Sequence, residues 1–231
     1  MVIPVSKPLH TNSTEPVILF GGTFDPIHLG HLRAAVEIRE RIGAKTLWLL
    51  PCHLPGHRDL PGTSTQHRIN MIKLAIQGDH HIEATNLKID SRECECQQTS
   101  YTVKTLLSIR KEIGETTPLI LCLGMDSFNS LEQWYRWEQL LELTHLLVVQ
   151  RPGTQTTQSA TLQALLEKHL QSDRNTLSQT AAGSIWIENI TPLAISATAI
   201  RDQIKRGFSA RYLVPDKVWH YIKQKHLYNY T

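Results

Sequence analysis

The sequence predicts an α/β fold: a doubly wound, mostly parallel sheet with helices on both faces, and a small helical portion at the C-terminal end. Short apolar runs alternate along the chain with segments whose apolar residues recur at helical spacing, as in repeated strand–helix–strand units. The run 119–123 is apolar at every position, which is typical of a strand buried on both faces of a parallel sheet. A glycine-rich turn directly follows the first run, where such sheets bind their ligands.

The individual elements follow from this periodicity and from the residues that interrupt it. Strands are expected at 17–20, 46–50, 119–123, 145–149 and 184–187. Helices are expected at 32–42, 66–76, 101–113, 162–170, 197–205 and 216–225. Gly43 and Gly207 mark helix ends, and Pro51 ends the second strand.

The length of 231 residues is enough for one sizeable domain. We expect residues 1–14 to form an N-terminal tail and residues 15–231 to form a single domain, of which 190–231 is a C-terminal helical subdomain. The segment 131–141 is rich in Trp and Leu and connects two of the strands.

The composition excludes several classes of protein. A net charge of +3 falls short of the basic stripe of a nucleic-acid-binding protein, so no nucleic-acid partner is expected. No apolar stretch approaches the roughly 20 residues of a membrane helix, and the amino terminus lacks a signal-peptide core, so we expect a cytoplasmic protein without a membrane partner. The four cysteines are too few for a disulfide framework, and Cys94 and Cys96 form only C-x-C, which favours incidental thiols over a zinc site.

The strongest functional signal is the run GGTFDPIHLGH, which begins at Gly21, between the first strand and the first helix. Gly21 and Gly22 have no side chains and can adopt positive φ, so a nucleotide phosphate can approach the main-chain N–H groups. Thr23 adds a hydroxyl donor. Asp25 and the proline after it favour an ordered turn, in which we expect Asp25 to have a structural role such as capping the helix.

Two histidines close this run. His28 and His31 are three residues apart, so on a first helical turn both rings should project from one face towards the phosphates, and Gly30 keeps that face open. Their N–H groups can donate hydrogen bonds to phosphate oxygens whose charge changes in the transition state, without a covalent intermediate. A lone histidine would be assigned to a helix cap or the core, and zinc would need a third ligand nearby. The pair after a Gly-Gly-Thr turn favours phosphate binding.

A second candidate phosphate motif, ISATAIR, ends at Arg201. Ser196 and Thr198 lie at an expected helix amino terminus and Arg201 on its first turns, an arrangement suited to phosphate oxygens. In isolation the pattern would favour an ordinary serine N-cap with a solvated arginine. Together with the first motif, it favours phosphate binding.

The run GGTFDPIHLGH resembles the signature of the adenylyl- and cytidylyltransferases distantly related to class I aminoacyl-tRNA synthetases, and ISATAIR resembles a second segment of that superfamily. The fold implied is a Rossmann-like nucleotidyltransferase. Further stretches resemble the bacterial nicotinate-nucleotide adenylyltransferases, so that the resemblance extends over residues 17–228. It implies that the catalytic residues are Thr23, His28, His31 and Arg201. It implies that ATP is bound by Gly21, Gly22, Thr23, His28, Gly30, His31, Gly124, Asp126, Ser196, Thr198 and Arg201.

The same resemblance assigns a mononucleotide site. His57 and Arg58 lie in a loop that faces the mononucleotide phosphate in the family, although Gly56 replaces a proline usually found there and loosens the loop. Tyr101 and Thr102 belong to an S-Y-T segment whose main-chain N–H groups bind the pyridine carboxylate, as suits a helix amino terminus.

Two other segments complete the implied substrate contacts. Ser100 of the S-Y-T segment, taken alone, would fit a plain N-cap equally well. In the family, Gly124 adjoins adenosine, Asp126 accepts hydrogen bonds from ribose hydroxyls, and Trp134 stacks on the pyridine ring. Trp137 is assigned to the core.

The resemblance implies in-line attack by a nicotinate mononucleotide oxygen on the α-phosphorus of ATP, giving nicotinate adenine dinucleotide and pyrophosphate in NAD biosynthesis. The expected partners are ATP and nicotinate mononucleotide. Mg²⁺ should arrive on the ATP phosphates, with no metal site of the protein's own, since the sequence offers no dedicated carboxylate cage.

Alternatives remain open at this stage. They are a related enzyme acting on nicotinamide mononucleotide, and a non-catalytic nucleotide sensor of the same fold. Phosphopantetheine or a polyol phosphate is disfavoured by the chain length and by the S-Y-T and Trp-Tyr segments. A homo-oligomer is also left open.

Overall fold

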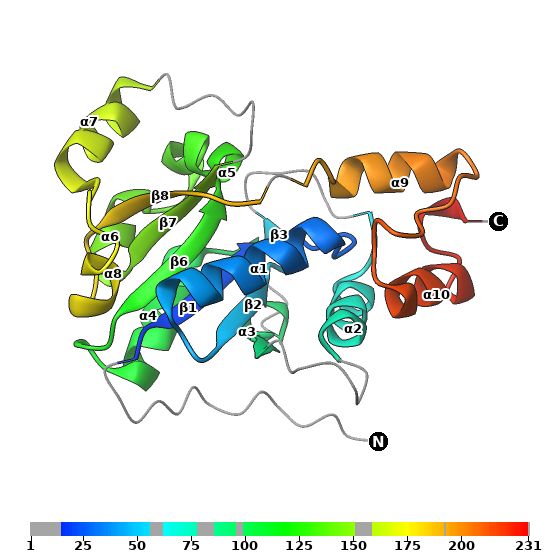
Figure 1. The fold of residues 1–231 in the computed structure, drawn as a ribbon, viewed down its shortest axis with the longest axis horizontal. Helices are drawn as coiled ribbons and strands as arrows, with labels where there is room; N and C mark the ends of the chain where they lie inside the picture. The colour runs from blue at the N-terminus through cyan, green and yellow to red at the C-terminus, as the bar shows by residue number, and fades with distance from the viewer. Residues whose placement is uncertain are drawn as a thin grey trace.

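The structure is a computed structural model that describes residues 15–55, 62–77, 86–95, 99–150, 159–191 and 193–230. Six strands form its main sheet: β1 (Val17–Gly22), β2 (Leu47–Pro51), β4 (Leu87–Ile89), β6 (Leu119–Gly124), β7 (His145–Gln150) and β8 (Ile185–Asn189). The strand order is β4-β2-β1-β6-β7-β8, and every neighbouring pair is parallel. The chain therefore winds outward from β1 in one direction and then from β6 in the other, which confirms the doubly wound parallel fold (Figure 1).

The sheet is buried on both faces, and its strands alternate between two core clusters. Ile18 and Phe20 of β1 belong to one cluster, while Val17 and Leu19 belong to the other. Because both faces are covered, an apolar residue is needed at nearly every strand position, which explains the continuous apolar runs in the sequence.

Helices cover the two faces as follows. The first cluster joins the sheet to α1 (Leu29–Ile42), α2 (Thr65–Ile76), α9 (Ala197–Lys205) and α10 (Asp216–Gln224). The second joins it to α4 (Thr102–Ile113), α5 (Met125–Asn129), α6 (Leu140–Leu143) and α7 (Ala160–His169). Figure 1 shows α9 and α10 on the same side of the molecule as α2, away from α7.

Several short elements differ from the expected pattern. The strand β4 was not expected, because three residues are too few for a periodic signal. The segment 131–141 contains two 3₁₀ turns, η1 (Leu131–Gln133) and η2 (Trp137–Gln139), before α6. The remaining short elements are β3 (Leu54–Pro55) and β5 (Thr99–Ser100), which pair in a small parallel sheet, and the helices α3 (Arg92–Glu95) and α8 (Thr176–Gln179).

The C-terminal residues turn back onto the body of the protein through η3 (Leu227–Asn229). His226, Tyr228 and Asn229 have positive φ of 50°, 59° and 61°. Such left-handed conformations cost about 1–2 kcal/mol for most residues. Leu227 and Tyr228 are nonetheless buried, so packing holds this strained end in place.

No helix in the described ranges combines the length and the apolar character that crossing a membrane requires.

Candidate active site

The two glycine-containing strand ends lie side by side at the point where the strand order reverses. Strands β1 and β6 are neighbours in the middle of the sheet, with Phe20 opposite Cys122, and they end at Gly22 and Gly124 respectively. A Cβ atom added at Gly124 would find no atom within 4 Å. Open parallel sheets bind ligands at this switch point, so the structure brings two separate parts of the expected ATP site together.

His28 and His31 form a reciprocal cap at the start of α1. His28 is the N-cap residue, and its Nδ1 accepts a hydrogen bond from the His31 main-chain N–H at 3.4 Å. The Nδ1 of His31 accepts one from the His28 main-chain N–H at 3.3 Å. Because each Nδ1 is an acceptor, the proton of each neutral ring is on Nε2, the atom that can donate to a phosphate.

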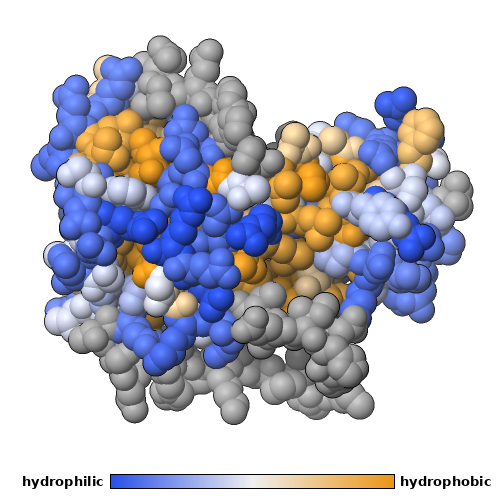
Figure 2. Space-filling view, viewed as in Figure 1, coloured by the Kyte–Doolittle hydropathy of each residue, from blue (hydrophilic) through white to orange (hydrophobic). Residues whose placement is uncertain are grey.

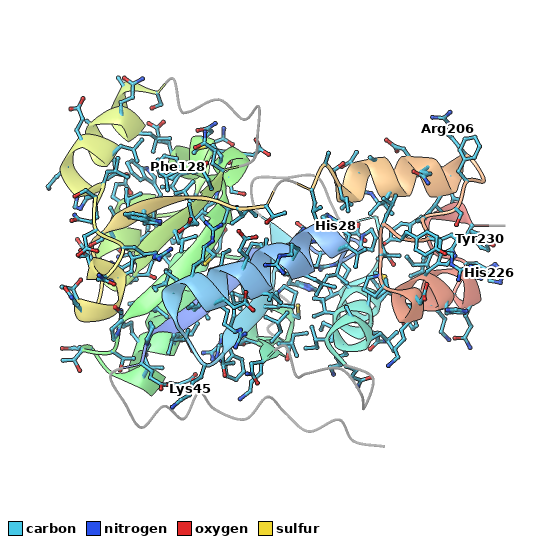
Figure 3. The ribbon with its side chains drawn as sticks, viewed as in Figure 1. His28, Lys45, Phe128, Arg206, His226 and Tyr230 are labelled. Atoms are coloured by element: carbon cyan, nitrogen blue, oxygen red, sulfur yellow. The ribbon has the colours of Figure 1, made fainter. Side chains whose placement is uncertain are left out.

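The two imidazoles are stacked, with ring centroids 3.6 Å apart and planes inclined by 25°. His28 is only 1% exposed, whereas His31 is half-buried. The expected first-turn arrangement is thus modified, since His28 precedes the helix and caps it. Figure 3 shows His28 at the end of α1 that faces the C-terminal helices.

Gly30 and Gly22 are needed for close packing around these residues. A Cβ at Gly30 would lie 3.0 Å from Nδ1 of His28, and one at Gly22 would lie 2.9 Å from the ring of Phe24. Phe24 itself has a positive φ of 51° and is buried. The small residues in this run therefore allow the His28 and Phe24 rings to pack directly against the main chain.

Asp25 does not cap α1, so the expected capping role is wrong. Its side chain is 2% exposed and accepts hydrogen bonds from the Gly62 main-chain N–H at 2.6 Å and the Tyr228 hydroxyl at 2.7 Å. These partners lie 37 and 203 residues away along the chain. The role is structural, as expected, but it joins distant segments instead of ending a helix.

The second motif meets the first at the same aspartate. Nη1 of Arg201 donates to the Asp25 main-chain oxygen at 2.7 Å, and Nη2 donates to Oγ1 of Thr198 at 3.3 Å. Ser196 is the N-cap of α9, and its hydroxyl accepts from the Ala199 N–H at 3.2 Å. Ser196 and Thr198 thus shape the start of α9 and the direction of Arg201, which lies against the glycine-rich turn.

A fully buried arginine supports this turn, and the sequence analysis missed it. Arg68 of α2 is 0% exposed. Its guanidinium donates to the main-chain oxygens of Thr23 at 2.8 Å, Cys52 at 2.7 Å and His53 at 2.9 Å, and to Oγ1 of Thr65 at 3.0 Å. The available signal was a cation at helical spacing from Met71 and Ile72, on the apolar face of a predicted helix.

The expected pyridine end lies at the start of α4. Tyr101 is the N-cap and makes no side-chain capping hydrogen bond, so Ser100 is not the cap. The Tyr101 and Tyr135 rings lie 4.8 Å apart, and Trp134 and Tyr101 are both partly buried against the same core cluster. Trp137 packs against that cluster too, in agreement with its assignment to the core.

Four other residues named in the sequence analysis remain: one lies in a described helix, and three lie outside the described residues. Asp126 lies in the first turn of α5, two residues after Gly124, and is exposed. Gly56, His57 and Arg58 lie outside the described residues.

The protonation state of the buried Tyr228 hydroxyl follows from its surroundings. Burial raises the pKa of Tyr228 above its ordinary value, and the Asp25 carboxylate raises it further, although Arg201 and Arg68 act in the opposite direction. The Tyr228 hydroxyl therefore stays protonated and is the donor in its hydrogen bond to Asp25.

Comparisons with known proteins show the family of the chain. The cytidylyltransferase-like family model matches residues 19–203. A protein of Cellvibrio japonicus named as a probable nicotinate-nucleotide adenylyltransferase is 46% identical over 210 residues, which cover 91% of this chain and 97% of that protein. One of Hahella chejuensis with the same name is 41% identical over 215 residues, covering 93% and 96%.

Solved structures show the same fold at much lower identity. The Plasmodium falciparum nicotinic acid mononucleotide adenylyltransferase complexed with NaAD has a TM-score of 0.72 and 17% identity, with 94% of this chain and 98% of that chain covered. The same enzyme complexed with APC has a TM-score of 0.66.

Proposed function

Since the chain belongs to the cytidylyltransferase-like family and, within it, to the nicotinate-nucleotide adenylyltransferases, we propose that it transfers AMP from ATP to nicotinate mononucleotide. The products are nicotinate adenine dinucleotide and pyrophosphate. The observation that supports this most directly is the 2.7 Å hydrogen bond from Arg201 to the Asp25 main chain, which joins two phosphate motifs 176 residues apart.

The reaction needs no nucleophilic side chain. A phosphate oxygen of the mononucleotide attacks the α-phosphorus in line, a bond to that oxygen forms, and the bond to pyrophosphate breaks. The Nε2–H groups of His28 and His31 and the Arg201 guanidinium donate to the phosphate oxygens, where negative charge shifts during transfer. Thr23 adds a hydroxyl donor, and Gly21, Gly22 and Gly30 leave the main chain accessible.

The substrate-binding roles proposed here are those that the family resemblance implies. Gly124 and Asp126 at the end of β6 bind the adenosine half. Tyr101 and Thr102 bind the pyridine carboxylate through the uncapped amino terminus of α4, and Trp134 stacks on the ring. The phosphate groups of the two substrates are bound in addition by Ser196, Thr198, His57 and Arg58. The C-terminal subdomain, residues 190–231, carries Arg201 into the site.

Mg²⁺ would act as a companion of ATP. The polar groups that converge here are imidazoles, a guanidinium and hydroxyls, which suit phosphate oxygens better than a bare cation. Across the described part of the chain, no group of three or more His, Cys, Asp or Glu side chains could hold a metal ion. Mg²⁺ on ATP would partly neutralise the phosphates and keep most of its waters.

The test is pyrophosphate release by the purified chain with Mg-ATP and either nicotinate mononucleotide or its amide. We expect faster release with the acid, and a dinucleotide product of matching mass. Faster release with the amide would assign the chain to the related specificity, and nucleotide binding without pyrophosphate release would show a sensor. His31→Asn should lower kcat by about 100-fold. The matched variant His220→Asn, at an exposed histidine on α10, should leave it unchanged.

A further inference from the structure

Asp25 joins three parts of the chain that are far apart in sequence. Its Oδ1 accepts from the Tyr228 hydroxyl at 2.7 Å, and its Oδ2 accepts from the Gly62 N–H at 2.6 Å. Its main-chain oxygen accepts from Arg201 at 2.7 Å. The proposed reaction uses Arg201 directly but gives no role to the other two contacts.

Gly62 lies close to both Asp25 and Arg201. A Cβ added at Gly62 would lie 3.2 Å from Cδ of Arg201 and 3.2 Å from Oδ2 of Asp25. Gly62 is the first described residue after the segment 56–61, which contains the expected mononucleotide loop. A displacement of the Asp25 side chain would therefore disturb both Arg201 and Gly62.

The C-terminal segment is bent sharply where it supplies the tyrosine. His226, Tyr228 and Asn229 all have positive φ, and the Tyr228 side chain is nevertheless buried. Figure 3 shows His226 and Tyr230, which flank Tyr228, among the C-terminal helices. A conformation this unfavourable persists only where the surrounding contacts require it, and the hydrogen bond to Asp25 is one of those contacts.

We infer that Tyr228 is a positioning residue for adenylyl transfer: its hydroxyl fixes Asp25, and through Asp25 it holds Arg201 and Gly62 in the arrangement that binds the phosphates. The inference rests on the proposed function, because Arg201 must contact the phosphates for its position to matter. It adds a requirement that the C-terminal end of the chain be docked before transfer can proceed.

The test compares Tyr228→Phe with the wild-type chain in pyrophosphate release at saturating substrates. The substitution keeps the ring and removes only the hydroxyl, so we expect kcat to fall about tenfold. Tyr230→Phe is the matched control, because its ring packs edge-on against Trp219 and, within the described residues, its hydroxyl has no hydrogen bond. Tyr230→Phe should retain the wild-type kcat.

A double-mutant cycle separates positioning from a general loss of stability. If Tyr228 acts through Arg201, then Tyr228→Phe should lower kcat less than about threefold in an Arg201→Lys background. An unchanged kcat in Tyr228→Phe, or the same tenfold loss in both backgrounds, would overturn the inference. The wild-type chain is assayed first, so a failure of the proposed function itself is recognised separately.

A second variant keeps the inference testable if Tyr228→Phe does not fold. Gly62→Ala leaves the tyrosine in place and crowds Asp25 and Arg201 from the opposite side. We expect a several-fold lower kcat at a thermal midpoint close to that of the wild type. Full activity in Gly62→Ala would contradict the proposed link between these groups.

Discussion

Replacing Arg68 by methionine should destabilise the whole protein and not only the site. The side chain donates four hydrogen bonds from a fully buried position, three of them to main-chain oxygens. Leaving one buried acceptor unpaired costs about 1–3 kcal/mol. Removing a buried charge and adding apolar contacts offsets part of the loss. We therefore expect a net loss of about 3–5 kcal/mol, which is large for a single substitution.

Urea unfolding followed by circular dichroism measures this loss, and the thermal midpoint should fall by about 10 °C for a chain of this size. Arg211→Met is the matched control, because Arg211 is largely exposed and its nearest acid, Asp216, is 3.9 Å away. The control should change stability by less than about 1 kcal/mol. Equal losses in the two variants, or a loss below about 1 kcal/mol at Arg68, would refute the view that its guanidinium holds the turn and the β2–β3 connection together.

Three further predictions concern His28, Gly30 and His145. His28→Asn keeps a capping acceptor and removes the Nε2 donor, so kcat should fall about 100-fold. The free energy of unfolding in urea should fall by only about 1 kcal/mol. A large loss of stability that accompanies the loss of kcat would contradict a catalytic role. Gly30→Ala brings a Cβ to within 3.0 Å of the His28 ring, so kcat should fall with little change in the KM for ATP, and an unaltered kcat would count against the observed packing. Burial lowers the pKa of His145, with a contribution from Arg110 and an opposing one from its hydrogen bond to Thr180. The unfolded state then binds the proton more readily, so the stabilisation is present above the unfolded pKa of about 6.5 and is lost as pH falls through the folded value. His145→Gln should flatten the decline in unfolding free energy between pH 7 and pH 5, and an identical slope in both proteins would exclude His145 as its source.

Five of the six strands of the sheet, all except the three-residue β4, could be predicted from the sequence, because burial on both faces leaves a strong apolar pattern. The five expected strands all occur, with boundaries that differ by one or two residues. The first helix begins at Leu29, three residues earlier than expected, because its cap is His28 and histidine is not a usual capping residue. Local patterns of this kind predict that a helix or strand is present more reliably than they predict where it begins and ends.

The contacts that organise the site could not be inferred from local patterns. Asp25 was expected to cap a helix because aspartate before a helix usually does so, but its partners are Gly62 and Tyr228. Arg68 was missed because a buried cation is favourable only where several oxygens converge, and those oxygens come from two separate connections. Such groups become visible only when the fold brings distant segments together.

The position of Arg201 ties the integrity of the site to the packing of the C-terminal helices. Helices α9 and α10 share the first core cluster with the sheet and α2, and the Tyr221 hydroxyl of α10 also contacts His67 and Asn70 of α2 at 2.9 Å each. A region attached by a few polar contacts and one apolar face can open before the central sheet unfolds. We expect such an opening to withdraw Arg201 from the glycine-rich turn, whereas the two histidines keep their reciprocal cap. Under the proposed function, we therefore expect phosphate binding at the end of β1 to be separable from catalysis of transfer, which depends on the C-terminal residues that return to Asp25.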